Sequence, residues 1–110
     1  MKQYPHSVIG SKNIYIGEKF SLKIVNAKNQ NNQLYNKEII QHPGSVVILP
    51  IDKNQDIILI EQHRIAINKT IIELPAGTLG KNEDHYEGAN RELREETGYR
   101  AKNIKLIHKM

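Results

Sequence analysis

One segment of this 110-residue chain is patterned as a helix, and it constrains the fold more than any other feature. Asp84 can cap a first turn, Glu87 three residues later completes a capping box, and Gly98 is a typical helix terminator. Four residues between them fall on one stripe at helical spacing: Tyr86, Ala89, Leu93 and Thr97. The pattern therefore predicts a helix from about His85 to Thr97.

The rest of the chain carries short apolar or alternating runs that are typical of strands. They predict strands at residues 20–24, 35–41, 46–49, 57–61 and 70–74, with a last one from Ile104 to the end. The polar stretch 26–36 is predicted to be a loop, because Asn and Gln side chains compete with regular backbone pairing. Residues 52–55 are predicted to join strands 46–49 and 57–61 in a hairpin with a buried core. About six strands and one helix make an α+β or mixed α/β domain.

Composition excludes several classes of protein. The chain has no cysteine, which rules out disulfides, thiolate zinc sites, iron–sulfur clusters and cysteine nucleophiles. Its longest apolar runs, such as residues 46–49, are too short for a membrane span or a signal peptide. We therefore expect no membrane partner and a cytoplasmic location.

The predicted helix carries more negative charge than its own stability favours. Glu92 lies three residues before Glu95 and four before Glu96, and each such like-charge pair costs about 0.2–0.5 kcal/mol. Glu92 has no basic residue three or four positions away, and Gly88 inside the helix costs about 1 kcal/mol relative to alanine. Clustered carboxylates without Cys or His favour Mg²⁺, Mn²⁺ or Ca²⁺. We expect a bound cation here, the alternative being an ordinary solvated acidic face.

A longer motif contains this helix. Gly77, five residues, Glu83, seven residues and then the run Arg91–Tyr99 resemble a complete Nudix box, at residues 77–99. The flanking stretches 73–77, 61–64 and 42–44 are similar to those of the ADP-ribose pyrophosphatase branch of this family.

The resemblance implies a fold and a division of the chain. The family fold is an α/β/α sandwich with a mixed sheet, and one helix carries the box. In this branch a further loop, another catalytic glutamate and a second covering helix lie beyond the position of Met110, so we expect that helix to be missing here. Residues 1–41 are expected to form N-terminal strands, a possible dimerisation arm, and residues 42–110 the Nudix core. The resemblance also implies a homodimer, although a polar loop between two strands is equally typical of a monomer.

The resemblance further implies an enzyme that hydrolyses the pyrophosphate bond of a nucleoside diphosphate linked to another moiety, with ADP-ribose yielding AMP and ribose 5-phosphate. It implies Mg²⁺ or Mn²⁺ held by three glutamates and a backbone carbonyl: Glu92, Glu95, Glu96 and Ala76. Glu83 and Arg91 complete the catalytic set by supporting the helix and its carboxylates. Substrate binding falls to Arg64 and Glu73, and a guanidinium suits a diphosphate because it can bind it bidentately.

The residues alone leave other interpretations open. Pro75 to Gly77 is equally typical of a turn that ends a strand, and Arg64 of a surface arginine at a strand end. A second function is a truncated, non-catalytic Nudix-like module that binds nucleotide or a partner. A third, nucleic-acid binding, is suggested by a sequence pI near 9.3. We do not expect nucleic acid as a partner, because aromatic residues are few and no such motif is present.

Overall fold

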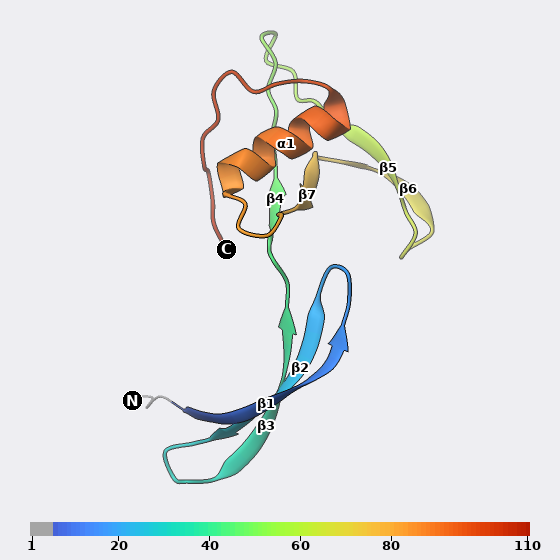
Figure 1. The fold of residues 1–110 in the computed structure, drawn as a ribbon. Helices are drawn as coiled ribbons and strands as arrows, with labels where there is room; N and C mark the ends of the chain where they lie inside the picture. The colour runs from blue at the N-terminus through green and yellow to red at the C-terminus, as the bar shows by residue number, and fades with distance from the viewer. Residues whose placement is uncertain (1–5) are drawn as a thin grey trace. The chain divides into compact units, whose positions relative to one another are not determined.

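The computed structural model describes residues 6–110, which form two units, one ending at Pro43 and the other spanning Gly44–Met110 (Figure 1). The order of elements is seven strands followed by one helix. Residues 6–110 contain a single helix, α1 (His85–Thr97). It is neither long enough nor apolar enough to cross a bilayer.

The first unit is an antiparallel sheet of three strands in the order β1 (Ser7–Ile16), β2 (Ser21–Lys28) and β3 (Leu34–Gln41). The loop predicted at residues 26–36 is shorter than expected, because Asn26 and Asn36 pair across β2 and β3. Backbone pairing uses groups that every residue except proline carries, so polar side chains facing solvent do not prevent it. The sequence did not predict β1.

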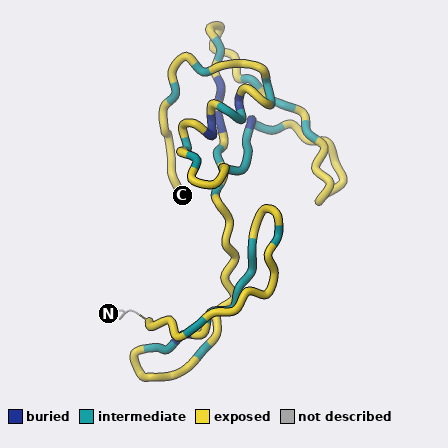
Figure 2. The backbone as a smooth tube through the Cα atoms, viewed as in Figure 1, coloured by how far each residue is buried: buried dark blue, intermediate teal, exposed yellow. Residues whose placement is uncertain are grey.

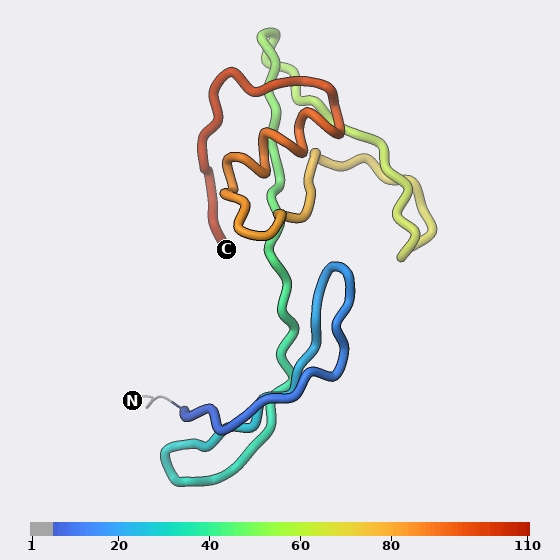
Figure 3. The backbone as a smooth tube through the Cα atoms, viewed as in Figure 1, coloured from blue at the N-terminus to red at the C-terminus, as the bar shows by residue number. Residues whose placement is uncertain are grey.

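The second unit holds two separate strand pairs. β4 (Ser45–Val47) pairs with β7 (Ala76–Thr78), and β5 (Ile60–Arg64) pairs with β6 (Lys69–Glu73), both antiparallel. The backbone trace shows the β5–β6 hairpin extending away from the region of α1 (Figure 3).

Two strand predictions for this unit were wrong. The hairpin expected between residues 46–49 and 57–61 is reduced to a bridge between Ile51 and Ile57, because β4 and β5 each pair with a later strand. Leu49 and Leu59 are exposed, and Ile48, which is buried in the predicted strand 46–49, packs with Ala89 and Leu93 of α1 and not across a hairpin. The strand expected from Ile104 onward is absent from the described chain. Ile104 instead packs its side chain against the small core cluster, which is contact without a backbone ladder.

The buried core residues of the second unit are on α1 and along the chain just after β4, where the backbone is coloured dark blue (Figure 2). Ile48, Ala89 and Leu93 form the cluster, and Leu93 is 3% exposed. Pro75, immediately before β7, is fully buried. Tyr86, predicted on the apolar stripe, is 39% exposed, so the buried stripe runs instead through Gly88, Ala89 and Leu93. This packing holds one side of α1 against β4 and β7.

The ends of α1 are those predicted. The Asp84 carboxylate accepts hydrogen bonds from the backbone N–H groups of Tyr86 and Glu87, which satisfies donors that the helix itself cannot. Gly98 adopts the left-handed conformation, with φ of 78°, and donates to the carbonyl of Arg94. Local caps therefore set the position of the box helix along the chain.

Candidate active site

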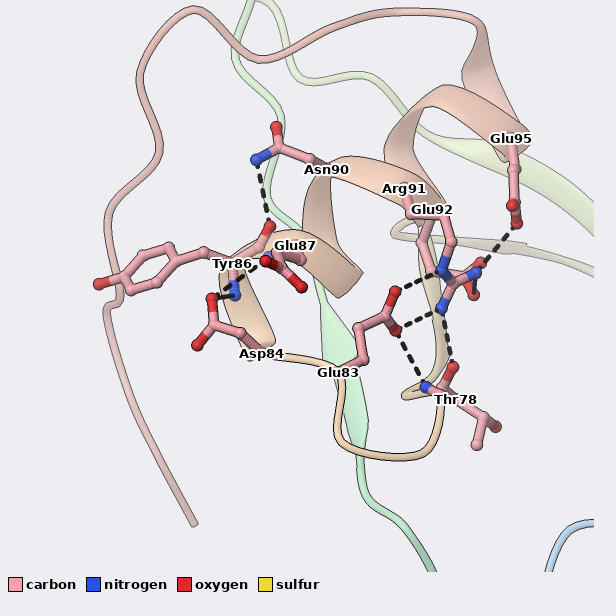
Figure 4. A network of polar contacts seen from close by, with 10 residues as sticks. Thr78, Glu83, Asp84, Tyr86, Glu87, Asn90, Arg91, Glu92 and Glu95 are labelled. Atoms are coloured by element: carbon pink, nitrogen blue, oxygen red, sulfur yellow. Dashed lines mark hydrogen bonds and ion pairs between the residues drawn. The ribbon is translucent and has the colours of Figure 1, made fainter.

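The guanidinium of Arg91 is the centre of the polar network along α1 (Figure 4). Its Nε and Nη2 atoms donate to the two carboxylate oxygens of Glu83, at 2.8 and 2.9 Å. Nη2 also donates to the backbone carbonyl of Thr78, at 3.1 Å. Arg91 thereby connects the helix both to the loop before it and to β7.

The third nitrogen of the same guanidinium reaches the acidic face of the helix. Arg91 Nη1 donates to Glu92 Oε1 at 2.7 Å and to Glu95 Oε2 at 3.1 Å. Glu92 has no basic residue three or four positions away, as the sequence indicates, but the adjacent Arg91 supplies its partner. Adjacent helix residues do not normally face each other. The long Arg91 side chain nevertheless bonds to Glu83 and to the Thr78 carbonyl, and in this position its Nη1 atom reaches Glu92. The negative charge of this face is partly compensated by the protein itself.

Glu83 is held in its ionised form. Besides the two bonds from Arg91, its Oε1 accepts the backbone N–H of Gly80 at 2.9 Å. The hydrogen bonds from Arg91, followed by the one from Gly80, lower the pKa of Glu83 from 4.5 to about 2. In turn, the hydrogen bonds that Arg91 donates to Glu83 and Glu92 raise the pKa of Arg91 above its ordinary value. The ion pair is thus fully charged at neutral pH, and it anchors Arg91 beside the other glutamates.

Strand β7 packs against α1, and each of its three residues contacts a different side chain of the helix. The N–H of Ala76 donates to Glu96 Oε1 at 3.1 Å, and Thr78 accepts from Arg91. Between them, the carboxyl group of Glu92 lies so close to Gly77 that a Cβ atom there would overlap it. Glycine at this position therefore leaves the space that the Glu92 carboxylate fills.

Gly88, the glycine inside the helix, has an equally direct packing explanation. A Cβ at this position would overlap the side chain of Leu79, just after β7. The absence of a side chain lets the helix approach that loop closely. From the sequence alone, the helix-breaking tendency of Gly88 favoured a bound cation. The contact with Leu79 explains the glycine without one.

The backbone of β7 also shows which way the Ala76 carbonyl points. The bonds from Ile48 N to Pro75 O and from Leu79 N to Gly44 O bracket the β4–β7 ladder. Because bonded and non-bonded pairs alternate in an antiparallel ladder, Ala76 and Thr78 belong to the non-bonded pairs. The backbone N–H and C=O groups of both residues therefore face away from β4. The Ala76 N–H and the Thr78 carbonyl confirm this, because both bond to side chains of α1. The Ala76 carbonyl therefore lies on the side of Glu96.

The donor chemistry of this region suits a hard divalent cation. Within residues 6–110, no protein donor bonds to Glu92 Oε2, Glu95 Oε1 or Glu96 Oε2. The Glu92 side chain is 13% exposed and that of Glu95 54%, so the first is confined and the second is able to move. No three His, Cys, Asp or Glu side chains of the described chain are gathered into a formed metal cluster. The oxygens fit the cation in kind, and gathering them requires side-chain rotation.

Arg64 and Glu73, both predicted to bind substrate, contact each other. Arg64 Nε donates to Glu73 Oε1 at 2.6 Å and Nη2 to Oε2 at 2.7 Å, a bidentate ion pair on the β5–β6 hairpin. The hydrogen bond from Arg64 lowers the pKa of Glu73 below 4.5, against the opposing effect of burial. The two residues form one unit, separate from the Arg91 network.

Two members of the Arg91 network were not predicted from the sequence. They are the Thr78 carbonyl, which accepts from Arg91, and the Gly80 N–H, which donates to Glu83. Both are backbone groups, so residue type carries no signal for them. Gly80 lies three residues before Glu83, which is the spacing at which a Glu side chain can reach back to a backbone N–H as in a capping box, and that spacing is the signal that could have found it.

Comparisons with known proteins agree with this architecture. The family model described as the NUDIX domain matches residues 41–110. The chain is 36% identical over 107 residues to an ADP-ribose pyrophosphatase of Bacillus subtilis (strain 168), covering 97% of this chain and 58% of that protein. It is also 36% identical over 106 residues to the methanol dehydrogenase activator of Bacillus methanolicus, covering 96% of this chain and 57% of that protein.

A solved structure described as an ADP compounds hydrolase shares the fold. It superposes with a TM-score of 0.76 over 94% of this chain and 56% of the other, at 24% sequence identity. The predicted Nudix fold is therefore confirmed. The chain spans a little more than half the length of these relatives. The matching family model and the shared fold together establish that the chain belongs to the Nudix family.

Proposed function

We propose that this chain carries the catalytic helix of a Nudix hydrolase that cleaves the pyrophosphate bond of a nucleoside diphosphate linked to another moiety. ADP-ribose is the proposed substrate, with AMP and ribose 5-phosphate as products. The observation that carries the proposal is the alignment of Glu92 and Glu96 along β7, on the side to which the Ala76 carbonyl points. The relatedness to a protein named ADP-ribose pyrophosphatase favours this substrate.

The proposed metal ligands are Glu92, Glu95, Glu96 and the carbonyl of Ala76, with Mg²⁺ or Mn²⁺ as the ion. When bound, such a cation neutralises diphosphate charge and lowers the pKa of a coordinated water. The free carboxylate oxygens described above are the atoms available for this role. Rotation of the exposed Glu95 side chain would bring its carboxylate toward the other two.

Arg91 and Glu83 support this arrangement in the proposal. Arg91 holds one oxygen of Glu92 and leaves the other free, so the orientation of that carboxylate depends on the guanidinium. Glu83 keeps the guanidinium in place with two parallel hydrogen bonds, which is the strong bidentate geometry. Groups behind the ligands of a metal site typically change its affinity 10- to 100-fold when removed, so about that effect is assigned to this pair.

Release of AMP from ADP-ribose with Mg²⁺ tests the proposal. The Glu96→Gln variant should lose at least about a hundredfold in rate, because a neutral amide is a poorer ligand for a hard cation. Glu87→Gln is the matched control, since Glu87 is an exposed glutamate in the first turn of the same helix. Equal rates for wild type and Glu96→Gln would contradict the proposed role of the helix.

The non-catalytic alternative predicts a different result. Nucleotide binding in calorimetry without any AMP release, in the presence of either Mg²⁺ or Mn²⁺, would favour a binding or interaction module. One relative is named as an activator of another enzyme, which keeps this alternative in the test.

We also propose that two copies of the chain associate through the strands of residues 1–41. The described part of that unit exposes large apolar side chains, among them Val8 at 70%, Leu34 at 73% and Ile40 at 68%. Apolar side chains in such numbers on one small sheet are typical of an interface. Light scattering should give twice the monomer mass, and Leu34→Lys with Ile40→Lys should shift it to the monomer. A monomeric wild type would contradict the proposal.

A further inference from the structure

The Arg64–Glu73 ion pair joins residues that are not opposite each other on the hairpin. Within β5 and β6, Arg64 lies opposite Lys69, whereas Glu73 lies opposite Ile60. Arg64 and Ile60 are four positions apart along β5, which is about 13 Å along the hairpin. The two side chains nevertheless bond at 2.6 and 2.7 Å. The Arg64 side chain must therefore lie back along β5, from the tip of the hairpin toward its base.

The base of the hairpin adjoins the carboxylates of the box helix. Glu73 ends β6, and Ala76, three residues later, bonds to Glu96. The Glu96 carboxylate also contributes to the field that raises the pKa of Arg64, although less than Glu73 does. Glu73 thus brings the guanidinium toward the proposed metal ligands and away from the solvent at the hairpin tip.

The ion pair leaves part of the guanidinium free. Of the five N–H donors of arginine, Nε and one of the two on Nη2 are used by Glu73. The remaining donors, two on Nη1 and one on Nη2, have the planar geometry that binds phosphate oxygens. The Arg64 side chain is 44% exposed, so these donors are accessible to a ligand, whereas Glu73 is 19% exposed.

Glu73 itself is poorly suited to contact the substrate. Both of its oxygens already accept from Arg64, and its lowered pKa keeps it anionic beside a diphosphate of the same sign. Any effect of Glu73 on the substrate should therefore pass through Arg64.

We infer that Glu73 is a positioning residue that holds Arg64 along the hairpin, so that the free donors of Arg64 bind a phosphate of the diphosphate group beside Glu96. This inference rests on the proposed function, because it assumes a diphosphate substrate at the box helix. It assigns Glu73 a role different from the direct substrate contact that the sequence suggests.

A double-mutant cycle tests the inference on the 110-residue chain. The variants are Glu73→Gln, Arg64→Ala and the two combined, with Glu61→Gln as the matched control. Glu61 is an exposed glutamate of β5. Because it follows Ile60, which lies opposite Glu73, its side chain is on the other face of the hairpin from that of Glu73. The probe is inorganic pyrophosphate, with and without Mg²⁺, and its dissociation constant is measured by calorimetry.

Each single variant should weaken pyrophosphate binding roughly tenfold or more, as expected when a charged hydrogen-bonding group is lost or misplaced. The combined variant should bind as weakly as Arg64→Ala and no more weakly, because Glu73 acts only through Arg64. Glu61→Gln should bind as wild type does. With ADP-ribose, the same variants should raise KM and leave kcat within a few-fold.

A spectroscopic readout follows the orientation of Arg64 directly. The Nε–H resonance of Arg64, assigned by its loss in Arg64→Ala, should shift and exchange faster with water in Glu73→Gln. Glu73→Asp, which keeps the charge but shortens the side chain, serves as a second variant if Glu73→Gln unfolds. A thermal unfolding scan identifies any variant that has lost its fold.

Three results would overturn the inference. They are wild-type binding of pyrophosphate by Glu73→Gln, additive losses in the combined variant, and no pyrophosphate binding by the wild type. The proposed function fails in a different way, when the wild type binds pyrophosphate but releases no AMP from ADP-ribose. The binding cycle still decides the role of Glu73 in that case.

Discussion

The carboxyl group of Glu92 lies against Gly77, in the space that a Cβ atom at residue 77 would occupy. One residue is on α1 and the other on β7, fifteen positions earlier in the sequence. The contact explains why a residue without a side chain lies under the helix. It also makes the position of one proposed metal ligand depend on the strand.

Replacing Gly77 by alanine should lower Mg²⁺ affinity and the AMP release rate by about 10- to 100-fold. The three heavy atoms nearest to the added methyl group all belong to the flexible carboxyl end of the Glu92 side chain, so we expect the carboxylate to move while the backbone stays. Titration with Mn²⁺ and rate measurements check this. Gly10→Ala is the control, because a Cβ there meets nothing within 4 Å. Wild-type metal affinity in Gly77→Ala would contradict the prediction.

Arg91→Lys should reduce thermal stability and weaken metal binding roughly 10- to 100-fold, even though the positive charge remains. A lysine ammonium cannot reproduce the planar fork that reaches Glu83, Thr78 and Glu92 together. Thermal unfolding and calorimetry with Mn²⁺ are the measurements. Arg94→Lys, an exposed arginine of the same helix, provides the comparison, and similar behaviour of the two variants would count against the network.

The stability contributed by the Glu83–Arg91 pair should depend on pH. The pKa of Glu83 is lowered from 4.5 to about 2 in the folded protein, so its contribution is present above pH 4.5. This contribution to stability is lost as the pH falls from about 4.5 to about 2, because at the lower pH Glu83 is protonated in both the folded and the unfolded protein. Urea unfolding at several pH values should show the gap between wild type and Glu83→Gln closing over this range. A gap independent of pH would disprove the assignment.

Loss of the helix cap should cost stability without touching the acidic face. Asp84→Ala removes the acceptor for the N–H groups of Tyr86 and Glu87, and it should lower the free energy of unfolding by about 0.5–2 kcal/mol. Asp84→Asn retains a capping oxygen and should lose much less. Chemical denaturation distinguishes the two, and equal losses would show that the charge of Asp84 matters more than its cap.

Features that depend on neighbours along the chain could be predicted from the sequence. The ends of α1 are determined by Asp84 and Gly98, whose capping roles need only the adjacent turn. The spacing from Gly77 to Tyr99 likewise identified the family, which the domain match over residues 41–110 bears out. The metal ligands, the dimer and the cytoplasmic location stay predictions.

Features that depend on distant contacts could not be predicted in the same way. β4 pairs with β7 across about thirty residues, and the short apolar run of residues 46–49 does not specify that partner. The segment from Ile104 onward has strand-like residues but forms no ladder within the described chain. The Ile104 side chain packs against the core cluster, whereas Leu106 and Ile107 are exposed.

By itself the sequence determined where the helix begins and ends and which carboxylates lie on it, because helix periodicity and capping act within a few residues. Only the tertiary structure decided that Arg91 reaches Glu92, that Gly77 leaves room for that carboxylate, and that Arg64 turns back to Glu73. Each of these contacts depends on how a long side chain is directed by an element from another part of the chain. That direction is set by packing and by satisfaction of charge.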